Sequence, residues 1–464
     1  MSHATREMSH GQSPRAAPSE LLRNSKVDDD HLGNFCRWLG LSGEEDVGNR
    51  ALRLHVLTIN NLGTGPNVFG VTSGYLRELL SCSRNLKSLT LHGLIEYVIT
   101  PGQLRSALQA LPSLEYIDLA NITAQYKDIF ADALCAPRSV SLSFVPNPHH
   151  HPRLTKEILV DIFPFLCHPS LQGIESLTIK AARLDAYSVS FPALRRLEAD
   201  SCWLREVHAD ALAGSFPSLQ YLSLSSIYFP TTTVPDAVIG MPLSEMHDGR
   251  NFAGRSRRLQ GMQRAMLEQA TWPSLQILRV GTALEWYALH MACPIACVQL
   301  WTPGAQRCPE EISQALADSR PRCLGARVLE SQLLRMSEAL FRPLEQSPCT
   351  TRLVLAMSLS KTPHIDFRKL GDGLNGTSIS YLLVQIQWPI RQQTAATVWR
   401  QTVLSAQAFI NCHSTPPALQ RFWVESYQLG RLVGWILEAG GTWKESSNES
   451  LAVIAEEGVD RMWT

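Results

Sequence analysis

Phe216–Leu224 has the sequence FPSLQYLSL and decides the fold, because variants of it recur along the chain. The clearest copies are Leu111–Leu119, Phe191–Leu197 and Trp272–Val280. Each begins with a large apolar residue, proline, a small residue and leucine, and apolar residues follow three and five positions after that leucine. Proline cannot continue a helix, and the alternation after it is typical of a short strand with one buried face. One such unit cannot bury its own apolar face, so the copies are predicted to stack.

The strand template L-x-x-L-x-L fits many further places in the chain, and segments with helical periodicity lie between them. Good matches begin at Leu54, Leu86, Leu114, Leu194, Leu219 and Leu275, and weaker ones at Pro137, Ile174, Ile295, Cys323, Thr350, Ile379 and Leu419. The wide gap between Leu219 and Leu275 predicts an insertion at about residues 230–270. Alternation of short strands and helices predicts an α/β solenoid, a horseshoe with parallel strands on its concave face and helices on its convex face.

Helix signals and composition divide the chain into a long solenoid and two tails. Residues 1–27 are predicted to be a disordered tail, residues 28–445 the solenoid with an N-terminal capping helix, and residues 446–464 a polar tail. A strand at Phe422, followed by Trp435 and Trp443, predicts a C-terminal cap. Threonine or proline at the start of apolar runs predicts helices after Thr100, Thr123 and Thr155, from Cys308 and from Glu330, over 255–269 in the insertion, and over Thr394–Ile410.

The charge and the cysteine content exclude several classes of protein. Lys and Arg number 42, and Asp and Glu also number 42, so the net charge offers no reason to expect nucleic acid or an anionic membrane as partner. The 11 cysteines are scattered, which is typical of buried thiols in a reducing compartment. Because we find neither a membrane-spanning apolar run nor a secretory signal, we expect an intracellular protein of the cytoplasm or nucleus.

Four motifs suggest chemistry, and each has a plainer structural interpretation. Gly371–Gly376 matches G-x-G-x-x-G, but a strand-like segment follows it, so a loop is favoured over a dinucleotide site. Cys293, Cys297, Cys308 and Cys323 do not have the spacing of a zinc knuckle, and His149–His151 is interpreted as a solvated loop. We therefore predict no metal and no cofactor. The arginines at 250, 255, 257, 258 and 264 indicate a solvated face or, alternatively, contact with an acidic partner or nucleic acid.

A stacked array aligns the outward strand positions on one surface. These positions combine small polar residues with aromatic and arginine side chains, the composition of a protein-binding patch. The alternative is that the insertion or the cap covers some of the aromatics. The candidate binding residues are Tyr116, Asp118, Lys180, Arg196, Asp200, Tyr221, Trp301, Tyr381, Arg421 and Trp423.

The repeats resemble irregular leucine-rich repeats, and the chain is similar to fungal F-box/leucine-rich-repeat proteins. The residues that carry the resemblance are the proline-containing repeats above, Asn85–Leu91 and His31–Leu39. The resemblance implies a leucine-rich-repeat-like solenoid that recognises substrates for an SCF ubiquitin ligase through a Skp-type adaptor and a cullin. Two departures accompany it. The F-box itself is missing, or the match of Pro18–Leu22 to its start is chance, which makes the adaptor and cullin doubtful partners. The usual turn asparagine is replaced by apolar residues at 62, 94, 122 and 227, whereas Cys202 fits the pattern.

These observations predict a non-enzymatic protein–protein interaction module that needs no cofactor. A repeat scaffold unrelated to ubiquitin is the alternative among binding proteins. A hydrolase or transferase with an unrecognised site is the alternative among enzymes.

Overall fold

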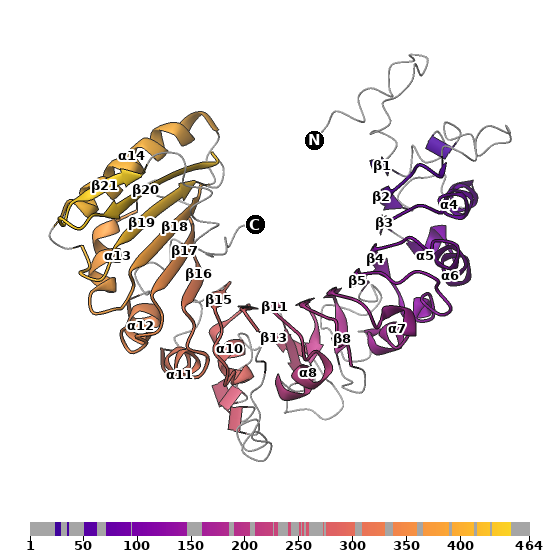
Figure 1. Ribbon diagram of the computed structural model, residues 1–464, viewed down its shortest axis with the longest axis horizontal. Helices are drawn as coiled ribbons and strands as arrows, with labels where there is room; N and C mark the ends of the chain where they lie inside the picture. The colour runs from indigo at the N-terminus through magenta and orange to yellow at the C-terminus, as the bar shows by residue number, and fades with distance from the viewer. Residues whose placement is uncertain are drawn as a thin grey trace. The chain divides into compact units, whose positions relative to one another are not determined.

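The structure of the protein, a computed structural model, describes residues 24–28, 35–36, 51–62, 71–93, 95–145, 160–184, 190–204, 209–225, 227–230, 240–242, 250–251, 253–254, 257–258, 272, 275–301, 309–329, 337–359, 365–388, 392–412, 415–426 and 429–446. The chain divides into two compact units. Unit 1 is Met1–Pro148 with Val160–Ile179, and unit 2 is His149–Leu159 with Lys180–Thr464. Each is a mixed α/β unit in which short strands form a mostly parallel sheet, which confirms the predicted fold class in its main feature (Figure 1).

The strands of unit 1 lie side by side in the order of the chain. They are β1 (Asn24–Asp28), β2 (Val56–Leu62), β3 (Ser88–Gly93), β4 (Tyr116–Ile122), β5 (Ser139–Phe144) and β7 (Ser176–Lys180), and β1 to β5 pair in parallel. Its helices are α4 (Val71–Cys82), α5 (Ile95–Val98), α6 (Pro101–Gln109) and α7 (Phe163–Leu166), with 3-10 turns at Ala124–Tyr126 and Pro169–Leu171 and a short strand β6 (Val160–Asp161). Figure 1 shows α4, α5 and α6 on one side of these strands.

Unit 2 continues the same plan with longer strands toward its end. Its sheet runs β9 (Arg196–Asp200), β11 (Tyr221–Ser225), β14 (Ile277–Val280), β15 (Cys297–Leu300), β16 (Cys323–Leu329), β17 (Arg352–Ser358), β18 (Tyr381–Gln387), β19 (Arg421–Ser426), β20 (Arg431–Leu437) and β21 (Trp443–Ser446). The last two strands, β20 and β21, pair antiparallel, unlike the parallel strands before them, and β21 is the edge strand. A smaller sheet holds β8 (Ala182–Leu184), β10 (Trp203–Leu204), β12 (Tyr228–Pro230) and β13 (Gly240–Pro242).

The helices of unit 2 lie on one face of its main sheet (Figure 1). They are α8 (Ala209–Ser215), α10 (Ala283–Leu289), α11 (Pro309–Ser319), a π-helical turn at Ser337–Phe341 leading into α12 (Arg342–Glu345), α13 (Phe367–Leu374) and α14 (Gln392–Ile410). Within the part of the chain that the structure covers, none of the helices combines the length and apolar character that crossing a membrane requires.

The recurring proline motif forms a tight turn just before each strand. In its best copy the N–H of Leu219 donates to the carbonyl of Phe216 at 3.2 Å, with Pro217 at the second turn position, which its fixed φ favours. The first residues of neighbouring copies pack on one another. Phe191 stacks on Phe216 with 5.9 Å between ring centroids, and Trp272 Nε1 donates to the Phe216 carbonyl at 3.0 Å. The motif is therefore both a turn and a packing contact between repeats.

A backbone hydrogen-bond pattern repeats where the strands start. The carbonyl of Arg195 accepts the N–H groups of both Gln220 and Tyr221, at 2.8 and 2.9 Å, and the carbonyl of Gln220 in turn accepts those of Gln276 and Ile277. The same double acceptance occurs at His55, Lys87, Glu115, Arg138, Arg322, Thr351 and Ser380. Apolar residues stand where regular repeats carry the turn asparagine, and Ile122 and Ile227 are buried there. Backbone bonds at the strand starts thus link the repeats without an asparagine ladder.

The two faces of each sheet differ, and we name them the helix face and the row face. The helix face carries the helices, and on the opposite row face in-register strands align their side chains in rows. In β3, Leu89 and Leu91 are buried on the helix face while Ser88 and Thr90 are half-buried on the row face, as the alternation predicts. In β17 to β19 most side chains on both faces are buried, and the segments LVLAM of β17 and YLLVQI of β18 are accordingly apolar except for Gln385, whose Nε2 donates to Glu425 Oε2 at 2.8 Å.

Several of the predicted helices that can be checked are present, and two are wrong in whole or in part. Helix α6 starts with a capping box between Thr100 and Gln103, α11 starts at the predicted proline, and α14 covers the predicted long helix. Within the described part of the helix predicted after Thr155, Val160–Asp161 is the strand β6 and only Phe163–Leu166 is helical. The helix predicted after Thr123 is instead a 3-10 turn in which the threonine side chain makes no capping bond. The left-handed backbone at Asp132, with a φ of 58°, is incompatible with a helix through this segment.

The ends and the insertion partly match the predicted boundaries. Strand β1 crosses the tail boundary predicted at residue 27 and pairs with β2, while residues 1–23 lie outside the described residues. Strand β11 pairs directly with β14, so the insertion between them does not interrupt the order of the sheet. Most of the helix predicted over 255–269, and the tail after residue 446, also lie outside the described residues.

Replacing a glycine at the cap tests the packing of the last strands. Gly434 in β20 lies opposite Trp423 in β19, and a Cβ added to Gly434 would lie 1.9 Å from the indole Cε3. We expect Gly434→Ala to lower the free energy of unfolding by about 1–3 kcal/mol, the range for overpacking. Gly440→Ala, where a Cβ would meet nothing within 4 Å, should change it little. Equal urea midpoints for the two variants would contradict this packing.

A pair of neighbouring substitutions tests the assignment of the two faces. Leu222 is fully buried on the helix face, so Leu222→Asp places an unpaired carboxylate in the core and should abolish cooperative unfolding. Tyr221 lies on the row face, where Tyr221→Ala removes the contact with Arg196 and the long hydrogen bond from Arg279 and should cost about 1–2 kcal/mol. Thermal unfolding followed by circular dichroism measures both. Similar losses would mean that the faces are assigned wrongly.

Candidate protein-binding surface

The row face of unit 2 brings together arginine and aromatic side chains from several strands. The guanidinium of Arg196 lies 4.0 Å from the ring centroid of Tyr221, and Arg279 Nη1 donates to the Tyr221 hydroxyl at 3.5 Å. The guanidinium groups of Arg279 and Arg327 lie 4.6 and 5.1 Å from the ring centroid of Trp301. We call these five residues the arginine–aromatic row. Each guanidinium held over a ring contributes about 0.5–1 kcal/mol at an exposed site.

The row is charge-balanced at one end and basic at the other. Glu198 accepts hydrogen bonds from Arg196 Nε and Nη2 at 2.8 and 2.5 Å, and Asp200 accepts one from the Ser225 hydroxyl at 2.6 Å. At the other end two guanidinium groups, those of Arg279 and Arg327, approach a single indole. Burial lowers the pKa of Arg327, although this group stays charged at neutral pH. The row therefore has a guanidinium–carboxylate pair at β9 and two guanidinium groups over one indole at β14 and β16.

The indole of Trp301 adds a polar group to the basic end. Its N–H is shielded from solvent and has no acceptor within the described part of the chain. The residue as a whole is half-buried, so other parts of the side chain are open to solvent. A buried donor without an acceptor is costly, so an acceptor from a bound partner would stabilise this position.

Unit 1 has a smaller polar cluster on its row face. Asp118 Oδ2 lies 3.0 Å from His92 Nε2 and accepts a hydrogen bond from the Tyr116 hydroxyl at 3.5 Å. Burial, and then the nearby Asp118 carboxylate, raise the pKa of Tyr116. Both neighbours therefore contact one carboxylate oxygen, which orients Asp118 and keeps Tyr116 protonated at neutral pH.

The structure keeps most of the predicted binding residues accessible and buries two of them. Tyr381 is 3% exposed and Trp423 is 0% exposed, so these two are not available to a partner in this structure. The sequence left open that some of the aromatic side chains are covered, and Tyr381 and Trp423 are indeed buried. Both lie in β18 and β19, where most side chains on both faces of the sheet are buried. The residues that remain exposed or half-buried are Tyr116, Asp118, Lys180, Arg196, Asp200, Tyr221, Trp301 and Arg421.

The prediction missed Arg279 and Arg327, although the repeat pattern points to both. Arg279 is five residues into the Trp272–Val280 copy, counted from its leucine, which is an outward position. Arg327 follows the template placed at Cys323, which pairs in register with Cys297. The template placed at Cys323 begins two residues further along its strand than the template placed at Ile295 does on the neighbouring strand. Because side chains alternate with a period of two, this shift leaves each side chain on the same face. Reading every outward position would have found both arginines.

The glycine-rich motif serves packing and lies mostly in a helix instead of the predicted loop. Helix α13 extends to Leu374 and strand β18 follows, which is the reverse of the strand-then-helix order that a dinucleotide site needs. A Cβ on Gly373 would lie 2.2 Å from Cδ2 of Phe341. The missing side chain therefore lets α13 pack closely on the preceding helical turn.

Part of the arginine-rich insertion pairs with the chain itself. Arg257 Nη1 lies 2.6 Å from Asp318 Oδ2, and Arg250 Nε lies 3.3 Å from Glu311 Oε1, with both carboxylates on α11. The guanidinium of Arg257 also lies 4.7 Å from the ring centroid of Tyr287. Arg257 is therefore held against α11, whereas Arg250 pairs with α11 and stays largely exposed, as the solvated-face interpretation predicts. The arginines at 255 and 264 lie outside the described residues.

The described histidines, cysteines and carboxylates form no group of three or more that could hold a metal ion. Cys293, Cys297 and Cys323 are buried thiols, while Cys308 and His149–His151 lie outside the described residues. No protein-family model matches the sequence, and comparison with curated proteins finds no match. The row's geometry is therefore the main guide to function.

One buried carboxyl group stands apart from the row and has a structural role. Glu285 forms a capping box at the start of α10, accepting from the Thr282 N–H at 2.8 Å, while its own N–H donates to the Thr282 hydroxyl. Burial raises its pKa to about 7, and hydrogen bonds from the backbone at Thr282, Ile227 and Gly281 oppose that rise.

This carboxyl group should make stability depend on pH. Its pKa rises from 4.5 to about 7 on folding, so between these values the folded chain binds more protons than the unfolded chain. The stabilisation is complete below pH 4.5 and is lost as the pH rises through about 7. In Glu285→Gln, which keeps an acceptor oxygen, the urea midpoint should change less between pH 5 and pH 7.5 than in wild type. The exposed Glu310→Gln serves as the control, and an equal change there would contradict the assignment.

Proposed function

We propose that the chain is a leucine-rich-repeat-like solenoid that works as a non-enzymatic protein-binding module, and that its partner contacts the arginine–aromatic row. The row itself carries this proposal. Arg196, Tyr221, Arg279, Trp301 and Arg327 come from successive strand units and form one continuous set of contacts. The repeated turns and the double backbone bonds at the strand starts support the solenoid part.

The chemistry of the row favours a protein partner with acidic side chains. Arginine, tyrosine and tryptophan are the residues that supply most of the binding energy at protein interfaces. The basic end, with Arg279 and Arg327 at one indole, suits carboxylates. The Trp301 N–H would donate to an acceptor on the same partner.

The resemblance to F-box proteins suggests a narrower version of this function. In that version the row selects substrates for an SCF ubiquitin ligase, and a Skp-type adaptor and a cullin bind elsewhere on the chain. Pro18–Leu22, the segment similar to the start of an F-box, lies outside the described residues. The row supports equally well a repeat scaffold that is unrelated to ubiquitin. The third alternative is a hydrolase or transferase. Charged groups of the row such as Arg196 and Glu198 already contact a ring or each other, and this arrangement favours binding over catalysis.

Photo-crosslinking in cells tests the proposal with the full-length chain. A photoreactive phenylalanine analogue in place of Tyr221 should crosslink a partner, whereas the same analogue in place of Leu404, exposed on α14, should not. Adding Trp301→Ala should reduce the yield at position 221 by about tenfold, because a central aromatic anchor contributes at least about 1.4 kcal/mol. Mass spectrometry identifies the crosslinked protein.

The same preparations separate the two versions of the function. Recovery of a Skp-type adaptor and a cullin with the full-length chain would support the ubiquitin version, and their absence would favour the scaffold. Equal crosslinking from positions 221 and 404, or a yield at position 221 that Trp301→Ala leaves unchanged, would refute binding at the row.

A further inference from the structure

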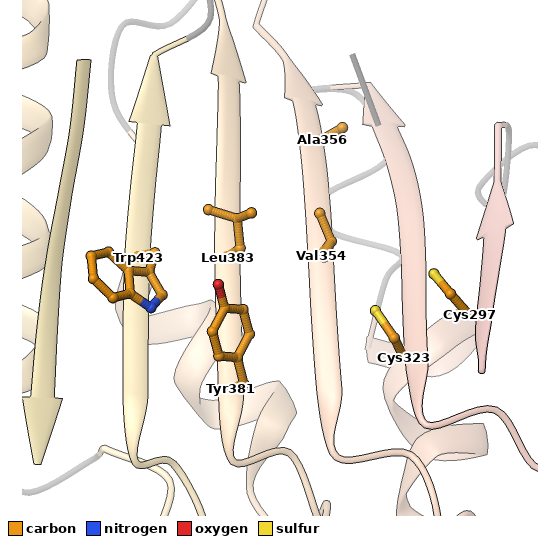
Figure 2. Packing of buried hydrophobic residues seen from close by; sticks show 7 residues of the cluster. All are labelled: Cys297, Cys323, Val354, Ala356, Tyr381, Leu383 and Trp423. Carbon is orange, nitrogen blue, oxygen red and sulfur yellow. The ribbon is translucent and has the colours of Figure 1, made fainter. Parts of the chain in front are cut away.

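Two cysteines stand opposite each other on the row face of unit 2. Cys297 in β15 and Cys323 in β16 are in register, and the backbone N–H of Cys323 donates to the carbonyl of Ala296 at 2.9 Å. Figure 2 shows both side chains projecting from the same side of adjacent strands. Among the strands that the structure describes, no other two cysteines are in register. Both belong to a buried apolar cluster whose other members are Val354, Ala356, Tyr381, Leu383 and Trp423.

The spacing of the two residues suits a disulfide bond. Residues in register on neighbouring strands have Cα atoms about 4.8 Å apart, and disulfide-bonded cysteines have Cα atoms about 4.4–6.8 Å apart. The Cβ atoms of bonded cysteines lie about 3.5–4.5 Å apart, slightly less than the strand spacing. A rotation of the side chains and an approach of the strands by less than about 1 Å therefore closes the bond.

We propose that Cys297 and Cys323 form a reversible disulfide bond on exposure to hydrogen peroxide. Neither is in a disulfide in this structure. One thiolate attacks the peroxide, which forms a sulfenic acid and releases hydroxide, and the second thiol then displaces the sulfenic hydroxyl group as water. Two thiols and one peroxide molecule thus give one disulfide and two water molecules, and the two electrons pass from sulfur to the peroxide. A dithiol reductant reverses the reaction by thiol–disulfide exchange.

Burial favours the disulfide over other oxidised forms of these thiols. Cys297 is 5% exposed and Cys323 is 3% exposed, so a small oxidant reaches them through local opening of the strands. Strand β15 has only four residues and is short enough to open in this way. The disulfide is uncharged and remains compatible with apolar neighbours such as Val354 and Leu383, whereas a sulfinic acid would place a charge among them.

The bond joins the two strands that lead to one end of the arginine–aromatic row. Trp301 follows Cys297 by four residues, and Arg327 follows Cys323 by four residues. The guanidinium of Arg327 lies 5.1 Å from the ring centroid of Trp301, so oxidation fixes β15 to β16 close to this contact. An effect on a bound partner rests on the proposed function, whereas formation of the bond does not.

Peptide mapping of the full-length chain tests the proposal. The folded wild-type chain is treated with hydrogen peroxide, its remaining thiols are alkylated in urea, and it is digested. Mass spectrometry should find Cys297 linked to Cys323, and a dithiol reductant should remove the link. The oxidised chain should also have a higher urea midpoint than the reduced chain, because the bond restricts the unfolded state.

Matched serine variants separate this bond from other oxidation. Cys297→Ser should abolish both the link and the rise in urea midpoint on oxidation, whereas Cys293→Ser, at another buried cysteine four residues earlier, should keep both. Mapping of the wild-type chain requires neither variant to fold. Oxidation of the exposed Cys167 and Cys349 that leaves Cys297 and Cys323 as thiols would overturn the proposal. A Cys297–Cys323 link that forms only in urea, or pairing of either residue with a different cysteine, would overturn it as well.

Discussion

The double backbone bond at the strand starts is the constraint on which the rest of the structure depends. One carbonyl, such as that of Arg195, accepts the N–H groups of two successive residues in the next strand unit. Because a slip of one residue would move every side chain to the opposite face, this bond fixes what each face presents. The proline turn immediately before it, as at Phe216–Leu219, places the next strand for the same bond. Backbone geometry thus sets the alignment of neighbouring strand units.

Once the register is set, the residues between the buried leucines decide how each part of the row face is used. Where they are polar, as in β3 and β4, the face is open to solvent and carries clusters such as His92 and Asp118. Where they are apolar, as in β17 and β18, both faces are buried. The arginine–aromatic row lies at the transition between these two regimes in unit 2. Arginine and tryptophan suit such a position, since their apolar parts pack while their polar ends meet a partner.

Several candidate binding residues could be predicted from the sequence, and the contacts of others could not. Tyr221 and Trp301 were predicted because alternation follows a recognisable motif. Trp423 obeys the same alternation, but its exposure depends on Gly434 across the strand pair and on what covers the cluster, and local periodicity reports neither. Gly371–Gly376 matches a nucleotide motif, yet its reason is the ring of Phe341, a contact between segments about 30 residues apart.

The sequence by itself determined the α/β class, the positions of most parallel strands and which side chains share a face, because proline turns and period-two patterns act within a few residues. Only the tertiary structure decided which face positions are covered and which arginines meet which rings. Arg279 and Tyr221 belong to strands separated by the insertion, and they meet because β11 pairs directly with β14. Contacts of this kind depend on strand order and packing across the sheet, which no local pattern encodes.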